Sequence, residues 1–136
     1  MQLKAFVGHS FNQNDKPIID EFLDFLNHVA SMGIQFTWDH AEWAEPKELS
    51  HKVKEKMKGK NVFIGICTSR EQVVVNENLT PVPFFHQFLK ARQDNFITKT
   101  SDWIIQEIGF AVGQDMSIII LLESGIRRPG GLQGDI

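Results

Sequence analysis

The stretch Asn61-Val-Phe-Ile-Gly-Ile-Cys-Thr68 decides the fold of this chain. Every residue between its polar ends is apolar or glycine, so a strand at this place would be buried on both faces. Strands of this kind are typical of the centre of a parallel sheet that carries helices on each side. The stretch therefore predicts an α/β domain with this strand near the middle of its sheet.

The segments on either side of this strand alternate between strand and helix. Three further strands are predicted, at residues 3–8, 34–39 and 117–122. Three amphipathic helices are predicted, at residues 14–33, 46–59 and 101–113. Such alternation produces a parallel sheet with right-handed crossovers. We therefore expect a flavodoxin-like three-layer sandwich, in which a central parallel sheet of four to five strands carries helices on both faces.

Residues 71–99 interrupt the alternation after the central strand. The run Val73-Val-Val75 could form a short strand, and residues 84–92 have the apolar spacing of a short helix. Because this insertion leaves the sheet at the edge where ligands bind in such folds, we expect it to act as a lid over a site.

The composition fits one domain and narrows the choice of partners. With 136 residues, of which 42% are hydrophobic, the chain can bury one substantial core. A net charge of -3 and a pI near 5.9 provide no basic surface for nucleic acid or an anionic membrane. One cysteine and no leader segment predict a cytoplasmic protein, and no His or Cys spacing is of the metal-binding kind.

The final residues, 125–136, have the composition of a loop and stop where a fifth strand would begin. We therefore expect residues 1–136 to form a single domain at the front of a longer polypeptide, with the final strand and helix of the fold absent.

The helix predicted at residues 101–113 carries the strongest candidate for chemistry. Ser101 or Thr100 can cap its start, and Trp103 and Glu107, four residues apart, share one face. A carboxylate beside a large aromatic surface suits a substrate with a flat ring and a sugar that becomes cationic during reaction. At this spacing, however, most such pairs are a partly buried aromatic residue with a solvated acid.

The carboxyl ends of the predicted strands supply candidates for binding, because parallel sheets bind ligands there. These candidates are Gly8, His9, Ser10, Asp39, Thr68 and Ser69. His9 and Ser10 could donate hydrogen bonds to ribose or phosphate, or could simply form the turn. Trp43, in the loop after the second strand, could close over a ring or could anchor its own loop.

The order of these segments resembles the TIR domain family, particularly its bacterial members in antiphage defence. Lys4-Ala-Phe-Val-Gly-His-Ser-Phe11 is similar to the opening strand of that family, and Phe36-Thr-Trp-Asp39 to its second strand. Trp103-Ile-Ile-Gln-Glu107 is similar to the Trp-x-x-x-Glu helix of the enzymatic branch. The resemblance covers nearly the whole chain, but the insertion at residues 71–99 is longer than the usual connection.

The resemblance implies an enzyme that cleaves the bond between nicotinamide and ribose, with NAD⁺ as substrate and no separate cofactor. Glu107 would be the catalytic residue, and Trp103, Trp43 and the strand-end residues would bind the substrate. The resemblance also implies self-association through TIR–TIR contacts as the activating step. A sensor module is expected in the C-terminal continuation.

Two other functions are compatible with the sequence. One is a non-enzymatic TIR interaction module, in which the loop around Trp43 binds a partner. The other is an enzyme resembling nucleoside deoxyribosyltransferases, which also use a Glu on an N-glycosidic bond. No Gly-x-Gly-x-x-Gly follows any predicted strand, which argues for a dinucleotide used as substrate rather than as a hydride carrier.

Overall fold

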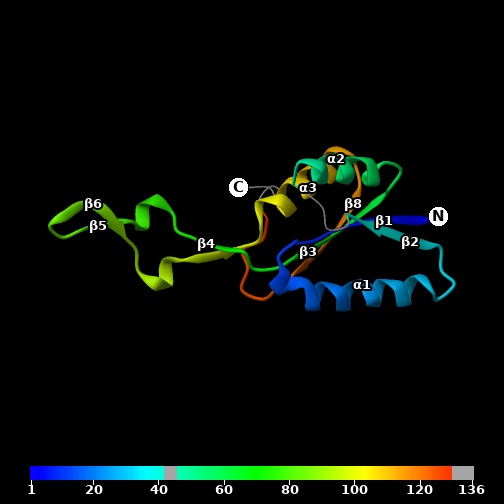
Figure 1. The fold of residues 1–136 in the computed structure, drawn as a ribbon, viewed down its shortest axis with the longest axis horizontal. Coiled ribbons are helices and arrows are strands. Elements are labelled where there is room, and N and C mark those ends of the chain that lie inside the picture. Colours follow the sequence, from blue (N-terminus) through cyan, green and yellow to red (C-terminus); the bar gives the residue numbers. More distant parts are fainter. Residues whose placement is uncertain (42–45, 130–136) are drawn as a thin grey trace.

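The computed structural model describes residues 1–41 and 46–129, apart from the side chains of residues 46–50 and 86. A parallel sheet with the strand order β2-β1-β3-β8 forms its centre (Figure 1). The strands of this sheet are β1 (Leu3–Gly8), β2 (Phe36–His40), β3 (Val62–Cys67) and β8 (Ser117–Leu122). All the residues of β3 are buried, which confirms the prediction that this stretch lies inside the sheet.

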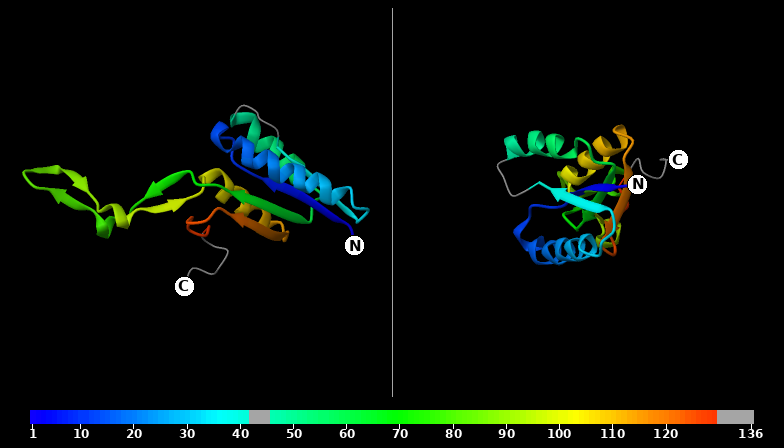
Figure 2. Two further views of the ribbon diagram at one scale, coloured as in Figure 1. Left: turned by 90° about the horizontal axis from the view of Figure 1, so that it is seen from below. Right: turned by 90° about the vertical axis from the view of Figure 1, so that its right-hand side faces the viewer.

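Helices cover both faces of the sheet. Helix α1 (Lys16–Ala30) lies on one face, and α2 (Pro46–Met57) and α3 (Asp102–Gly113) lie on the other, as the end-on view in Figure 2 shows. The chain is therefore an α/β protein with the three layers of a flavodoxin-like sandwich, as the sequence predicted.

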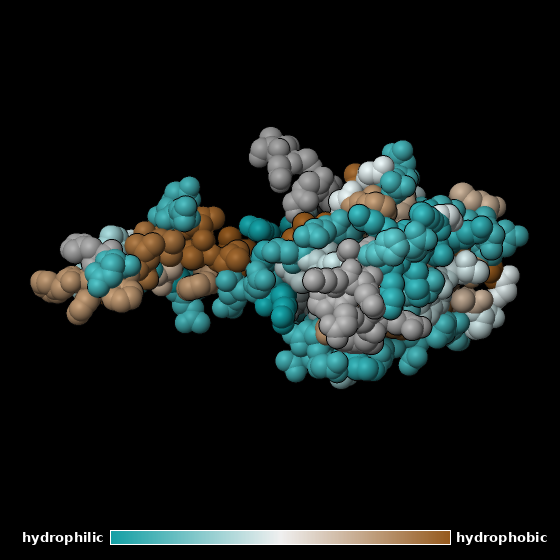
Figure 3. Space-filling model, turned by 45° about the horizontal axis from the view of Figure 1, so that its top comes forward, coloured by the Kyte–Doolittle hydropathy of each residue, from teal (hydrophilic) through white to brown (hydrophobic). Residues whose placement is uncertain are grey.

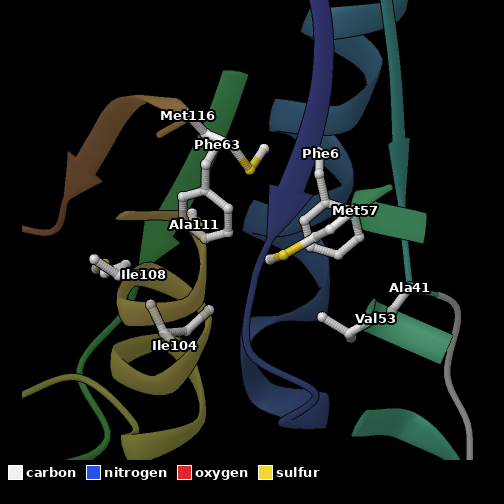
Figure 4. Close-up of a cluster of buried hydrophobic side chains, with 10 residues drawn as sticks. Phe6, Ala41, Val53, Met57, Phe63, Ile104, Ile108, Ala111 and Met116 are labelled. Carbon is white, nitrogen blue, oxygen red and sulfur yellow. The ribbon is translucent and has the colours of Figure 1, made fainter. Parts of the chain in front are cut away.

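The two faces of the sheet bury separate apolar clusters, because successive residues of a strand point to opposite sides. In β1, Ala5 and Val7 pack with the α1 residues Ile19 and Leu26, whereas Phe6 points to the other face. The second cluster joins Phe6 and Phe63 to residues of α2 and α3 (Figure 4). Helix α3 is thus fixed to the sheet by its buried apolar side.

Local signals mark the start of α3 and the ends of α1 and α2. The Ser101 hydroxyl accepts a hydrogen bond from the backbone N–H of Ile104 at the start of α3. Gly33 and Gly59, just beyond α1 and α2, have φ values of 77° and 75°, which glycine adopts without strain.

The insertion after β3 forms two antiparallel strand pairs, so the prediction of a helix at residues 84–92 is wrong. Strands β4 (Glu71–Val73) and β7 (Ile97–Lys99) form a stem, and β5 (Thr80–Val82) and β6 (Phe85–Lys90) form a hairpin beyond it. Short 3-10 turns, η2 (Asn76–Asn78) and η3 (Gln93–Asn95), separate stem and hairpin, and a third, η1 (Gln13–Asp15), precedes α1. A short amphipathic helix needs a surface to bury its apolar side, and the insertion has none nearby.

This insertion, which we call the arm (residues 71–99), projects away from the three-layer body and does not cover it as a lid (Figures 1 and 2). Apolar residues gather on its surface in the space-filling view (Figure 3). Phe84 is 94% exposed, and Phe85, Phe88 and Leu89 are each more than half exposed.

No helix in the described part of the chain is long and apolar enough to cross a bilayer.

Because the outer hairpin stands apart from the body, shortening the arm should leave the body folded. Replacing residues 74–96 with Asn-Gly would join β4 directly to β7 through a tight turn. We expect the free energy of unfolding, measured in urea, to change by less than about 1 kcal/mol, because the deleted residues leave the core untouched and the closed loop is shorter. A loss of several kcal/mol would contradict this independence.

Candidate functional site

The candidate site lies where β1 ends, beside helix α3. Glu107 projects from α3 and is only 5% exposed, although carboxylates are rarely buried without a partner. Its carboxyl oxygen Oε2 occupies the space that a Cβ atom on Gly8 would need, and Phe63 lies on the same side. Gly8 therefore allows the acid to lie against the end of β1, at the carboxyl edge of the sheet.

The surroundings of Glu107 are apolar, and its carboxyl group is incompletely satisfied. Burial raises the pKa of Glu107 to about 8, while the indole N–H of Trp103 acts in the opposite direction. The indole does not complete a hydrogen bond, because Trp103 Nε1 and Glu107 Oε2 are both buried without a hydrogen-bond partner in the described part of the chain. At neutral pH the carboxyl group of the free protein is therefore mostly protonated.

Trp103 lines two hollows. The smaller, of about 140 Å³, lies between α2 and α3. It is lined by Val53, Lys54, Trp103, Gln106, Glu107 and Phe110. The larger, of about 300 Å³, lies beside the end of β1 and the start of α3. It is lined by Ser10, Phe11, Asn12, Arg70, Ser101 and Trp103. The smaller hollow has room for one ring of a ligand, and the larger reaches the lower end of the usual range for ligand pockets.

His9 is held by a neighbouring histidine and lines neither hollow. Its Nδ1 donates to the carbonyl oxygen of Ser10 at 2.9 Å, since a carbonyl only accepts. The other nitrogen, Nε2, lies 2.9 Å from Nδ1 of His40, which then donates to it. Burial lowers the pKa of His9, with a further contribution from His40. The described contacts give His9 a structural role at the ends of β1 and β2.

The remaining strand-end candidates also have structural partners. Asp39 forms an ion pair with Lys56 of α2 at 3.2 Å. The Thr68 hydroxyl donates to Asp15 at 2.9 Å, and the backbone N–H of Ser69 donates to Glu123 at 2.7 Å.

Of the predicted binding residues, Gly8 lies against Glu107, and Ser10 and Trp103 line the hollows. Trp43 lies outside the described residues.

Several residues of the hollows were missed by the sequence reasoning. Phe11, Asn12 and Arg70 line the larger hollow, and Val53 and Lys54 of α2 line the smaller one. Arg70 could have been found, because it directly follows the strand-end pair Thr68 and Ser69. The α2 residues could not, because nothing in the sequence brings that helix beside α3.

Burial raises the pKa of the Cys67 thiol to about 11, which fits its interior place in β3.

The contact between Gly8 and Glu107 predicts a large effect of a single methyl group. In Gly8→Ala, the new Cβ would overlap Oε2 of Glu107 and lie 2.7 Å from Cζ of Phe63, so both side chains must move. We expect a loss of about 1–3 kcal/mol in the free energy of unfolding. The matched control is Gly109→Ala in α3, where a Cβ would meet no described atom beyond its own helix backbone within 4 Å.

This control should be neutral, or stabilising by up to about 1 kcal/mol, because alanine favours the helix. Urea unfolding of the two variants checks the prediction, and equal stabilities would contradict it.

Among the side chains that the structure describes, no three His, Cys, Asp or Glu residues are placed to hold a metal ion. Comparison of the chain with protein-family models, with curated proteins and with solved structures found no match.

Proposed function

We propose that this protein is an NAD⁺ glycohydrolase of the TIR type, with Glu107 as its catalytic carboxylate. The observation that carries the proposal is the burial of this acid at the carboxyl edge of a parallel sheet, with a tryptophan beside it and no partner for Oε2 among the described residues. A buried acid with a raised pKa beside a hollow is a common feature of catalytic sites. The Trp103-x-x-x-Glu107 spacing and the order of the motifs support the same family.

The reaction needs only one carboxylate. In NAD⁺ the nicotinamide ring is cationic, and the electron pair of the breaking C1′–N bond neutralises it as it leaves. No acid is therefore needed to protonate the leaving group. Positive charge develops on the ribose, as in glycoside hydrolysis, and Glu107 stabilises it. Water then bonds to C1′ and loses a proton, giving ADP-ribose; attack by an adenine nitrogen instead gives a cyclic product.

The substrate itself would prepare the catalytic group. In the free protein, burial keeps Glu107 mostly protonated at neutral pH. A cationic nicotinamide ring within about 4–6 Å would lower its pKa again and favour the carboxylate. Loss of the proton would thus accompany binding of the correct substrate. The small hollow beside Trp103 has the size for the ring.

Assembly is part of the proposal. TIR enzymes act as assemblies, so we propose that this protein is activated by self-association, as an antiphage-defence effector in the cytoplasm. Activity should then depend on protein concentration.

The proposal is tested by measuring nicotinamide release from NAD⁺ at high protein concentration, with and without a crowding agent. The wild type is compared with Glu107→Gln and with Glu21→Gln, which makes the same change on the exposed side of α1. Release by the wild type and by Glu21→Gln, but not by Glu107→Gln, supports the proposal. Equal release by all three proteins, or release by none, overturns it. Deoxynucleosides in parallel reactions test the deoxyribosyltransferase alternative.

A second candidate function is a protein-interaction module. The observation that favours it is the exposed apolar surface of the arm, around Phe84 and Phe88. Saturable binding of another protein, lost when residues 74–96 are replaced and accompanied by no turnover of NAD⁺, would select this function over the enzyme.

A further inference from the structure

We propose that the larger hollow binds a diphosphate group, with Arg70 as its principal anion-binding residue. The inference rests on the proposed function, because it assigns the part of a dinucleotide that lies next to the nicotinamide ribose. None of the residues chosen from the sequence provided a cation for this purpose. The structure places one at the root of the arm, within the hollow that also contains Ser10, Asn12 and Ser101.

Arg70 is positioned by its backbone, and its charge is left available. Its backbone N–H donates to the carbonyl oxygen of Lys99 at 2.9 Å, which fixes the residue where the arm leaves β3. The nearby acids are occupied: Lys99 bridges Glu71, at 3.4 Å, and Asp102. In the described part of the chain, the Arg70 guanidinium forms no hydrogen bond or ion pair of its own. A planar guanidinium in this state suits the oxygens of a phosphate group.

The other polar groups of the hollow are also set to donate. The Ser10 hydroxyl oxygen accepts from the backbone N–H of Asn12 at 3.0 Å, which leaves its hydrogen to be donated. The Asn12 side-chain oxygen accepts from the N–H of Asn14 at 3.0 Å, so its amide group can donate as well. The first turn of α3 begins at the same hollow and adds the positive end of its dipole. One cationic side chain and several hydrogen-bond donors therefore favour the binding of an anion in this hollow.

Trp103 connects this hollow to the candidate catalytic acid. It lines both hollows, and Glu107 lies one helical turn further along α3 in the smaller one. Among the described residues, Trp103 Nε1 and Glu107 Oε2 have no hydrogen-bond partner, and the two residues that carry these atoms line the smaller hollow. A ligand spanning both hollows would place its ribose near Glu107 and its diphosphate near Arg70. Its chemical class is a pyridine dinucleotide.

The test compares ligands with and without the diphosphate. ADP-ribose and inorganic pyrophosphate contain it, and nicotinamide riboside does not. Binding of each is measured by calorimetric titration to the wild type, to Arg70→Ala and to Arg70→Lys. The control is Arg92→Ala, which removes the same charge from the arm, where Arg92 pairs with Asp94. Thermal unfolding of all variants establishes that they fold.

We expect Arg70→Ala to weaken binding of ADP-ribose about 10- to 100-fold, the range for losing hydrogen bonds to a charged group. Arg70→Lys should keep part of the affinity, because it keeps the charge but loses the planar fork. Arg92→Ala should bind like the wild type, and binding of nicotinamide riboside should not depend on Arg70. For NAD⁺ cleavage, Arg70→Ala should raise KM with little change in kcat.

The possible failures are distinguishable. The diphosphate site is overturned if Arg70→Ala and the wild type bind ADP-ribose equally, or if neither ADP-ribose nor pyrophosphate binds. In either case, nicotinamide release by the wild type would still support the proposed function. Arg70-dependent binding of ADP-ribose without any nicotinamide release supports the diphosphate site and overturns the proposed function.

Discussion

Glu107→Gln is expected to lower the rate of nicotinamide release about 10²- to 10³-fold, which is the usual effect of removing one preorganised group that stabilises a charged transition state. Glutamine has nearly the same shape as the protonated acid, so the packing against Gly8 and beside Trp103 should remain. What the variant loses is the negative charge that forms when the substrate binds. The loss should therefore appear in kcat as well as in kcat/KM.

The pH profile gives this prediction a sharper form. Since burial raises the pKa of Glu107 to about 8, kcat/KM of the wild type should rise with pH and level off above about pH 8. The rise should be absent from the residual activity of Glu107→Gln. A wild-type profile that is flat between pH 5 and 9 would contradict the assignment of this carboxylate. Glu21→Gln should follow the wild type throughout.

The same substitution is expected to stabilise the protein at neutral pH. Below pH 4.5 the carboxyl group is protonated in both the folded and the unfolded chain, so its ionisation has no effect on stability. Above that pH the unfolded chain ionises, whereas the folded protein holds its proton until about pH 8. The folded state therefore loses stability as pH rises through this interval. At pH 7 the cost is about 3 kcal/mol, and glutamine removes it.

Urea unfolding at several pH values checks this second prediction. The stability difference between Glu107→Gln and the wild type should be below about 1 kcal/mol at pH 5 and should grow to about 3 kcal/mol at pH 7. Glu21→Gln provides the control, since its side chain is exposed and should show no such trend. A difference that does not change with pH would mean that Glu107 is not buried as an acid in solution.

Together, the two predictions describe an acid that is costly to the fold and useful only for chemistry. Substituting a residue with a merely structural role would lower the stability of the protein. Glu107→Gln should instead lower its activity and raise its stability. Such an exchange of stability for activity is common at catalytic sites. The combination of both results would be difficult to explain for an interaction module.

The sequence predicted the body of the fold well because its signals are local. The apolar run of β3, the Ser101 cap and the glycines beyond α1 and α2 each act within a few residues. The arm was less predictable, because Phe85, Phe88 and Leu89 have a spacing that fits either a short helix or a strand. These residues form a strand rather than a helix because β6 pairs with β5 and because a helix would have no surface to pack against.

For the candidate site, the sequence by itself determined that Trp103 and Glu107 share one side of a helix, since that depends only on the helical repeat. Only the tertiary structure decided that Glu107 is buried against Gly8, that Asp39 pairs with Lys56, and that Arg70 lies in the same hollow as Ser10. The physical reason is that burial and charge pairing depend on segments distant in the chain. Their contacts exist only after the strands and helices have packed together.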